Sequence, residues 1–199
     1  MADTKEKLHD EFVVTMDGLH DGWSALLAAD PQFFKAGLTL ASVPRRKQHL
    51  SLKDQAMIGL SVNAAATHLY RPGIKAHIAA ARKEGATIDE VLEVVELTST
   101  LGIHACNIGV PLLVETKDVV GAPTPRKGAL SPKMKELVYC AFDTAATHLY
   151  VPGLKLHMKN ALGYGATPQE ILEVMEIATL LSLQTAHETV PMIAELYGA

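Results

Sequence analysis

Apolar side chains recur every three to four positions along most of this 199-residue chain. That spacing is the period of an α-helix with one buried face, and the alternation of period two that indicates β-strands is nearly absent. Valine and isoleucine, which favour strands, fall inside the helical pattern instead. The sequence therefore predicts an all-α protein.

The first 50 residues predict a helical N-terminal extension. An amphipathic segment runs from about Thr4 to Ala29. Asp30 and Pro31 follow, and their residue types suit an N-cap and a first helical position. We expect a second helix from Gln32 to about Leu40, closed by Pro44.

The rest of the chain is an internal repeat. Residues 51–115 match residues 131–195 at a constant offset of 80, with 25 of the 65 aligned positions identical. The densest block reads Thr-His-Leu-Tyr-x-Pro-Gly-x-Lys-x-His in both copies. Because an internal repeat determines the architecture, we assign residues 1–50 to the extension, 51–115 to the first unit and 131–199 to the second. Residues 116–130, which contain prolines and glycines, are the predicted linker.

Each repeat predicts three helices. The first begins at Ser51 or Ser131, and the second begins at Pro-Gly and stops at Gly85 or Gly165. The third begins with a capping box, Thr-x-x-Glu, and should run to about residue 114 in one copy and residue 197 in the other. These third helices are apolar on more than one face, which is typical of helices buried between repeats or subunits. We therefore expect a homo-oligomer.

Composition excludes several function classes. The chain is 48% hydrophobic and 20% charged with a net charge of −4, and it has no basic stripe, so no nucleic-acid partner is expected. It lacks an apolar run of about 20 residues and an apolar leader, which predicts no membrane span and a cytoplasmic location. The two cysteines, Cys106 and Cys140, form no CxxC motif and are expected to be small buried residues.

Two histidine pairs are the main candidates for chemistry: His68 with His77, and His148 with His157. A Tyr-x-Pro-Gly break separates the members of each pair, and proline disfavours helical geometry in the residue before it. The chain must therefore turn, which lets the two histidines of a pair approach one another. Imidazole suits acid–base work near neutral pH, and it can also bind carboxylates. Alternatively, the histidines cap helix ends or bond across the repeat interface. The neighbouring side chains that add a phenol or an ammonium group are Tyr70, Tyr150, Lys75 and Lys155.

Other polar residues are weaker candidates. Glu93 and Glu96 are one helical turn apart and repeat as Glu173 and Glu176, for which a solvated face or a salt bridge is the favoured interpretation. His104 aligns with Gln184 and Asn107 with His187, and these positions could reach a pocket and contact a substrate. No histidine spacing of the kind that metal sites use is present, so no metal is expected.

The histidine, helix and capping-box arrangement resembles the carboxymuconolactone decarboxylase and AhpD-like superfamily. The stretches that carry the resemblance are His77 to Glu93 and His157 to Glu173, each with Gly-Ala-Thr before its third helix. The segment Leu101 to Asn107 is similar to an Ala-Gly-x-Pro-Ala-x-Asn segment of the decarboxylases. The resemblance covers both repeats, and it implies the AhpD-like helical fold. Because each chain holds two repeats, a trimer would reproduce the six-domain ring of single-domain relatives.

The two branches of the superfamily imply different chemistry. The AhpD-like branch reduces disulfides with a CxxC dithiol before the motif histidine, and no cysteine stands there in this chain. That branch also has an upstream glutamate, which Glu136 matches in the second copy and Ala56 replaces in the first. The second copy is therefore the more complete site.

The decarboxylase branch needs no cofactor and removes a carboxylate from a small conjugated lactone. His77 and His157 match its motif histidine, and Lys75 and Lys155 match a basic position; glycine stands where that branch usually carries a glutamate. The leading hypothesis is a cofactor-independent decarboxylase or lyase acting on a small carboxylated lactone or related organic acid. Its site would hold His148, His157, Tyr150 and Glu136, with His68, His77 and Tyr70 in a second or degenerate site. The rival hypotheses are a peroxidase or disulfide reductase, which the missing dithiol disfavours, and a non-catalytic ligand-binding protein.

Overall fold

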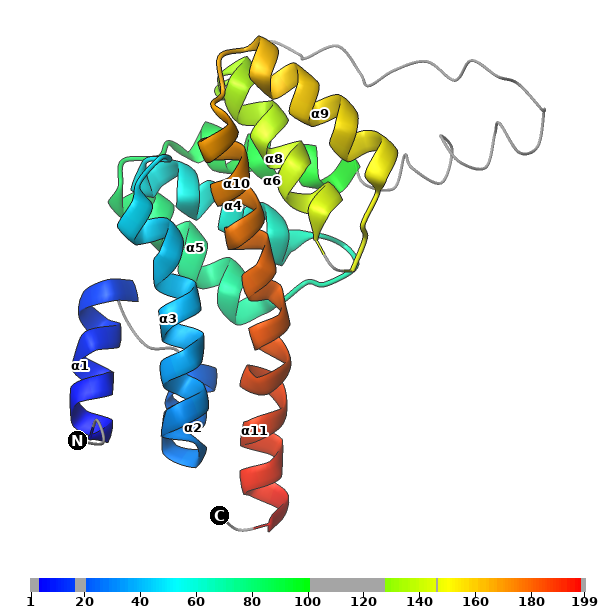
Figure 1. Ribbon diagram of the computed structural model, residues 1–199. Helices are drawn as coiled ribbons and strands as arrows, with labels where there is room; N and C mark the ends of the chain where they lie inside the picture. The colour runs from blue at the N-terminus through cyan, green and yellow to red at the C-terminus, as the bar shows by residue number, and fades with distance from the viewer. Residues whose placement is uncertain (1–3, 17–20, 101–127, 146, 198–199) are drawn as a thin grey trace, which may run out of the picture.

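The computed structural model describes residues 4–16, 21–100, 128–145 and 147–197, and every regular element in these ranges is helical (Figure 1). The N-terminal helices are α1 (Lys5–Met16), α2 (Asp21–Ala29) and α3 (Pro31–Lys47). The first repeat contributes α4 (Leu52–Ala64), α5 (Arg71–Lys83) and α6 (Ile88–Ser99). The second contributes α8 (Pro132–Thr144), α9 (Val151–Gly163), α10 (Pro168–Thr179), a 3₁₀ turn (Leu180–Leu183) and α11 (Gln184–Tyr197). The predicted all-α fold is confirmed.

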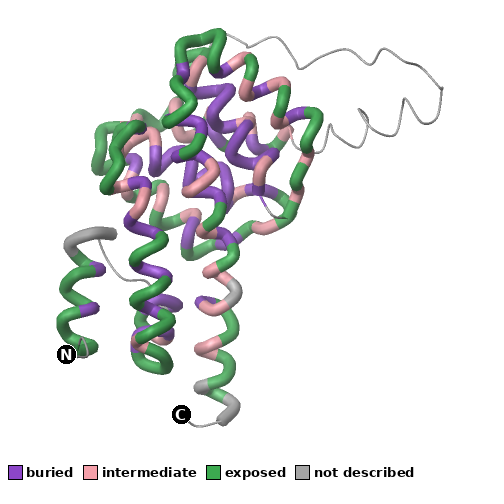
Figure 2. The backbone as a smooth tube through the Cα atoms, in the orientation of Figure 1, coloured by how far each residue is buried: buried purple, intermediate pink, exposed green. Residues whose placement is uncertain are grey.

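The two repeats share one apolar core. In each repeat the first helix packs along the second, and α4 and α8 meet at the centre of the upper body in Figure 1. The core side chains on these two helices are almost completely buried, including Ile58, Leu60, Val138 and Phe142. Figure 2 shows the buried segments concentrated there. Removal of this apolar surface from water is the main force that holds the repeats together.

A second core joins the two ends of the chain. Helices α1 to α3 pack beside α11 in the lower body of Figure 1, and α2 and α11 are in direct contact. Phe12, Trp23 and Phe34 form an aromatic group there, with ring centroids 4.8 to 5.5 Å apart. Leu180, Leu183 and Val190 from the second repeat pack against this group. The N-terminal helices therefore pack on the C-terminal helix, and α3 also contacts α4, where the Gln55 side chain donates to the Pro44 carbonyl at 3.2 Å.

The predicted caps of the helices within the repeats are confirmed. Ser51 and Ser131 cap α4 and α8 by accepting the amides of Asp54 and Met134 at 3.1 and 3.2 Å. The third helices begin with complete capping boxes at Thr87 and Thr167. Gly85 and Gly165 follow the second helices with φ of 82° and 86°, the left-handed region that glycine adopts without steric cost.

Two predicted boundaries were wrong. The amphipathic segment from Thr4 to Ala29 contributes α1 and α2, and residues 17–20 between them lie outside the described ranges. Pro44 does not close α3, since a proline in the last turn removes only one hydrogen bond and its own carbonyl still accepts the amide of Gln48 at 3.0 Å. The third helix of the second repeat is interrupted by the 3₁₀ turn at Leu180–Leu183. Leu181 is buried in the core shared by the repeats, whereas Leu180 and Leu183 pack against the second core. The predicted extension of the first repeat's third helix to residue 114 lies outside the described residues.

Each third helix carries a glutamate that binds the segment before the first helix of the other repeat. Glu173 on α10 accepts the Leu50 amide at 2.7 Å, just before α4. In the equivalent place, Glu93 on α6 accepts the Leu130 amide at 2.6 Å and forms an ion pair with Lys135 at 2.8 Å. Glu176 is paired with Lys47. The predicted salt bridges are therefore present, whereas a solvated face is wrong for Glu173, which is fully buried and whose pKa is raised by that burial.

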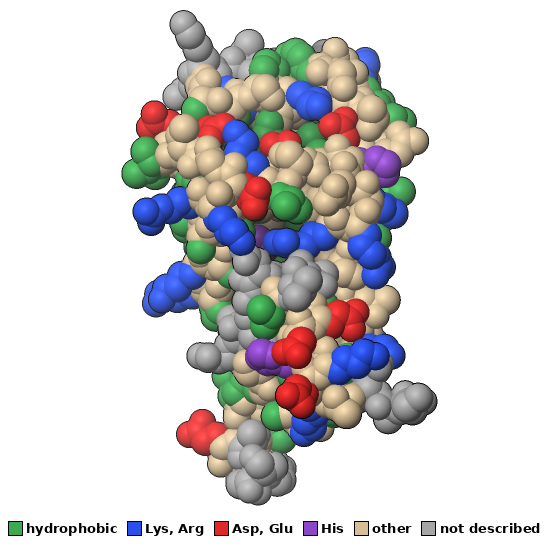
Figure 3. Space-filling model, turned by 90° about the vertical axis from the view of Figure 1, so that its left-hand side faces the viewer, with side chains coloured by type: hydrophobic (Ala, Val, Ile, Leu, Met, Phe, Trp, Pro, Cys, Tyr) green, Lys and Arg blue, Asp and Glu red, His purple; other side chains and the backbone are tan. Residues whose placement is uncertain are grey.

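The surface carries charges of both signs. On the face in Figure 3, lysine and arginine side chains form a band across the middle, and aspartate and glutamate side chains lie above and below it. None of the helices within the described ranges combines the length and the apolar character that a membrane span requires.

Candidate functional site

Each Tyr-x-Pro-Gly break forms the same tight turn. The amides of His68 and Leu69 both donate to the Ala65 carbonyl, at 2.8 and 2.9 Å, and the second copy repeats this with 2.8 and 3.0 Å. Leu69 and its counterpart Leu149 have φ of 48°, a left-handed conformation that is rare for leucine. Backbone strain of this kind is typical of sites whose side chains must be held in one position. The turn places a histidine and a tyrosine beside the start of α5 or α9.

In the second repeat, the predicted residues Glu136 and His157 form a buried pair. Glu136 comes from α8 and His157 from α9, and the His157 Nδ1 to Glu136 Oε2 distance is 2.6 Å. Both side chains are almost inaccessible, with 4% and 6% of their surface exposed. Asn160, one turn further along α9, donates to the same carboxylate oxygen at 3.4 Å. When Glu136 is ionised, Nδ1–H donates to it, which leaves Nε2 as the nitrogen that can exchange a proton.

Asp143, which the sequence analysis did not identify, lies between the two histidines. Its Oδ2 is 4.0 Å from Nε2 of His157, and its Oδ1 is 3.8 Å from Nε2 of His148. The side chain is completely buried, and burial raises its pKa to about 7, although the nearby His157 acts in the opposite direction. The spacing from Glu136 is seven residues, which puts both carboxyls on one face of α8. That spacing, present only in the second repeat, is the signal that could have identified it.

The turn therefore places both His148 and His157 near the carboxyl of Asp143. The two histidines of the pair approach one another by way of this carboxyl. His148 has 18% of its side chain exposed, and burial lowers its pKa. Tyr150 lies next to it, with ring centroids 5.9 Å apart. Four side chains thus follow one another, Glu136, His157, Asp143 and His148, and the last of them is partly exposed. We call this set the acid–histidine chain.

Aromatic and small residues complete the surroundings. The Tyr139 ring stacks on His157 with centroids 4.4 Å apart and planes 19° apart, which fixes the orientation of the imidazole. Gly153 follows the turn, and a Cβ at this position would clash with the Asp143 carboxylate and the Tyr150 ring. Cys140 is fully buried beside the acid–histidine chain, and burial raises the pKa of its thiol to about 12. A thiol in that state is not a nucleophile.

The first repeat keeps the histidines but not the acids. Ala56, Gly59 and Asn63 stand where the second repeat has Glu136, Tyr139 and Asp143. Asn63 Oδ1 accepts a hydrogen bond of 2.6 Å from the side-chain amide of Gln184 on α11. The side-chain oxygen of Gln184 is in turn hydrogen-bonded to His68. The His77 ring packs directly against the backbone of Gly59. Neutral amides therefore occupy the place of a carboxyl.

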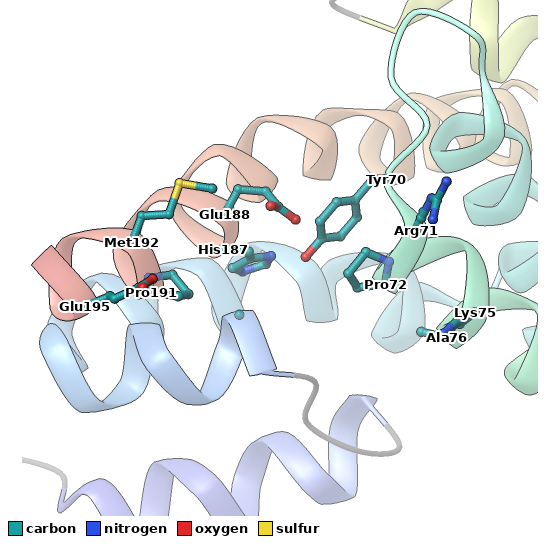
Figure 4. Close-up of a pocket in the computed structure, with 11 residues that line it drawn as sticks. Tyr70, Arg71, Pro72, Lys75, Ala76, His187, Glu188, Pro191, Met192 and Glu195 are labelled. Atoms are coloured by element: carbon teal, nitrogen blue, oxygen red, sulfur yellow. The ribbon is translucent and has the colours of Figure 1, made fainter.

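The predicted residues Tyr70, Lys75 and His187 line one cavity of about 690 Å³ between the start of α5 and α11 (Figure 4). A smaller cavity of about 120 Å³ adjoins it, shares Tyr70 and His187, and reaches His77 and Trp23. His187 is 4% exposed and packs on Trp23 with centroids 4.4 Å apart. Lys155 is exposed on α9. His104 lies outside the described residues.

The described residues contain no group of three or more histidine, cysteine, aspartate or glutamate side chains arranged to hold a metal ion.

Comparisons with known proteins agree with this architecture. The model of the "carboxymuconolactone decarboxylase family" matches residues 31–102 and again 114–189. A solved structure from Burkholderia xenovorans LB400, described as a "putative gamma-carboxymuconolactone decarboxylase subunit", is 37% identical and superimposes with a TM-score of 0.90 over 98% of each chain. A search of curated proteins finds no match. With its tandem matches and its helical fold, the chain belongs to the carboxymuconolactone decarboxylase family.

Proposed function

We propose that the protein is a cofactor-independent decarboxylase of a small carboxylated lactone, and that the second repeat does the chemistry. The observation that carries the proposal is the buried pair of Glu136 and His157, joined at 2.6 Å and followed by Asp143 and His148. A carboxylate that orients an imidazole through Nδ1 is a recurrent arrangement for proton transfer at Nε2. The family to which the chain belongs and the name of its structural neighbour support the same reaction class.

Loss of CO₂ from such a lactone needs an electron acceptor and a proton donor. The bond between the ring carbon and the carboxylate breaks, CO₂ leaves, and the electron pair moves through the conjugated double bond to the lactone carbonyl oxygen. His157 in its protonated form then gives the Nε2 proton to carbon, and the carbonyl re-forms. This leaves a neutral imidazole whose Nδ1–H is still directed at Glu136.

The remaining members of the acid–histidine chain would return the proton. Asp143 faces Nε2 of His157 on one side and His148 on the other, and its pKa of about 7 lets it hold or release a proton at neutral pH. Separations of 3.8 and 4.0 Å are those of ion pairs and exceed a hydrogen bond, so each transfer needs a small rotation of a side chain. His148, which is partly exposed, exchanges with solvent.

Two further groups would bind the substrate. Lys155, on the same helix as His157 and two residues before it, is the candidate to hold the substrate carboxylate, as the family pattern implies. Tyr150 offers a phenol next to His148. Disulfide reduction is disfavoured, because the chain has no CxxC dithiol and burial keeps the thiol of Cys140 protonated.

The test is turnover of γ-carboxymuconolactone, followed by ultraviolet absorbance. His157→Ala should lower kcat about 10²- to 10⁴-fold, the usual contribution of a positioned acid or base. His77→Ala is the matched control from the first repeat and should keep most of the turnover. Full activity of His157→Ala on a substrate that the wild type converts would overturn the assignment, and a wild type without turnover would redirect it to another small acid.

A further inference from the structure

The first repeat has a cavity but lacks the acids of the second. The two adjoining cavities, which we call together the first-repeat cavity, have Tyr70, Ala76 and His187 in common and lie on the side of the molecule where α5 meets α11. At the positions equivalent to the acid–histidine chain this repeat has Ala56 and Asn63. Space for a ligand is present, whereas the carboxyls proposed for proton transfer are replaced by a methyl group and an amide.

Charges of opposite sign border the cavity on opposite sides. Arg71 and Lys75 come from the first turns of α5, whereas Glu188 and Glu195 come from α11 (Figure 4). No side chain caps the start of α5, so its partial positive charge adds to that of the two basic residues. An anionic group on a ligand is therefore attracted to the α5 side, and a hydrogen-bond donor is attracted to the α11 side.

One wall of the cavity is aromatic. Tyr70 and His187 point toward each other in Figure 4, and both side chains are buried, at 7% and 4% exposure. Burial and the nearby Glu188 raise the Tyr70 pKa to about 12, so its phenol stays neutral. Trp23 lies behind His187 and borders the smaller cavity. Flat aromatic surfaces of this kind favour an unsaturated ring over an aliphatic chain.

We propose that the first-repeat cavity binds, without converting it, a small unsaturated ring acid that carries a carboxylate at one end and a hydroxyl at the other. The carboxylate faces Lys75 and Arg71, the ring lies against Tyr70 and His187, and the hydroxyl donates to Glu188. The site is separate from the acid–histidine chain, so its occupancy is independent of the reaction proposed for the second repeat.

The probe is 4-hydroxybenzoate, with benzoate and phenol as the ligands that lack one end. Trp23 is the only tryptophan of the chain, so its fluorescence reports locally on this cavity, and calorimetry measures the same binding without relying on the indole. We expect saturable binding of 4-hydroxybenzoate that is tighter than that of either partial ligand. Wild type and His157→Ala should bind it equally, because the second site is not involved.

Two substitutions of exposed residues locate the two ends of the ligand, and a third serves as their control. Lys75→Gln should weaken both 4-hydroxybenzoate and benzoate about fivefold, as expected for a partly exposed charge pair. Glu188→Gln should weaken 4-hydroxybenzoate but not benzoate. Lys83→Gln is the charge-matched control, since Lys83 is on the same helix, about 12 Å further along, and does not border the cavity.

Three results would overturn the proposal: no saturable binding by either readout, equal effects of Lys75→Gln and Lys83→Gln, or conversion of a bound acid by His157→Ala. A wild type that fails to decarboxylate γ-carboxymuconolactone would refute only the function proposed for the second repeat, because none of these binding measurements depends on turnover.

Discussion

Replacement of Asp143 by asparagine should make the protein more stable at alkaline pH. The folded state holds this carboxyl in the interior and raises its pKa to about 7, against an ordinary value of 3.8. Between these two values the folded protein binds a proton that the unfolded chain does not, so stability falls as the pH rises through this window. The destabilisation is complete above pH 7 and absent below pH 3.8.

The structure supports a magnitude for this effect. The difference between the two pKa values corresponds to about 4 kcal/mol of unfolding free energy above pH 7, of which about 2–3 kcal/mol develops between pH 5 and pH 8. Asparagine has nearly the same shape and does not ionise. The equivalent residue in the first repeat, Asn63, already shows that an amide is accommodated at this place in the fold.

Urea denaturation at pH 5 and pH 8, read by circular dichroism, measures the effect. Asp143→Asn should gain about 2–3 kcal/mol more at pH 8 than at pH 5 relative to the wild type. The reciprocal variant, Asn63→Asp, puts a carboxyl into the buried position of the other repeat and should lose more stability at pH 8 than at pH 5. A difference between Asp143→Asn and the wild type that is the same at both pH values would refute the reasoning.

Three other substitutions and one mass measurement test the remaining features. Gly153→Ala should lower the free energy of unfolding by about 1–3 kcal/mol, because its methyl group would meet the Asp143 carboxylate, whereas Gly163→Ala on the same helix has open space and should change it by less than about 1 kcal/mol. Cys140→Ala should keep the turnover of any substrate that the wild type converts, and a loss of turnover comparable to that of His157→Ala would restore thiol chemistry as an explanation. Glu173→Ala should cost about 1–3 kcal/mol in urea denaturation because it leaves the Leu50 amide without its acceptor, and an unchanged midpoint would contradict the role given to this contact. Light scattering should give the mass of a trimer, and a monomer mass would exclude the six-domain ring.

The helices and their ends were predictable because their signals are local. The capping boxes at Thr87 and Thr167, and the left-handed glycines at Gly85 and Gly165, each depend on residues within one turn of the chain. The pairing of Glu136 with His157 was proposed from the family pattern, since they are 21 positions apart and the segment between them includes the turn whose geometry decides their distance.

What the sequence could not supply is the partner of a polar side chain that lies far away along the chain. Nothing in the residues around Glu173 distinguishes it from a solvated glutamate. Its donors, the Leu50 amide and the Gln55 side chain, lie 123 and 118 residues earlier, and they make it a buried acceptor. Asp143 was not predicted because asparagine stands at the equivalent position of the other copy, and only residues shared by both copies indicated a functional position. The 3₁₀ turn before α11 contains no proline or glycine, so nothing in its residues interrupts the apolar pattern.

The two glutamate contacts between the halves of the chain have a consequence for how the halves could diverge in sequence. In a dimer of identical single-repeat chains, one substitution alters both sites at once, so a mutation that benefits one is imposed on the other. Here the hydrogen bond between Glu93 and Leu130 and the one between Glu173 and Leu50 lie within a single polypeptide. Each half can therefore mutate alone while the other half preserves the interface, and the presence of both acids in the second repeat alone is a difference that a tandem chain permits.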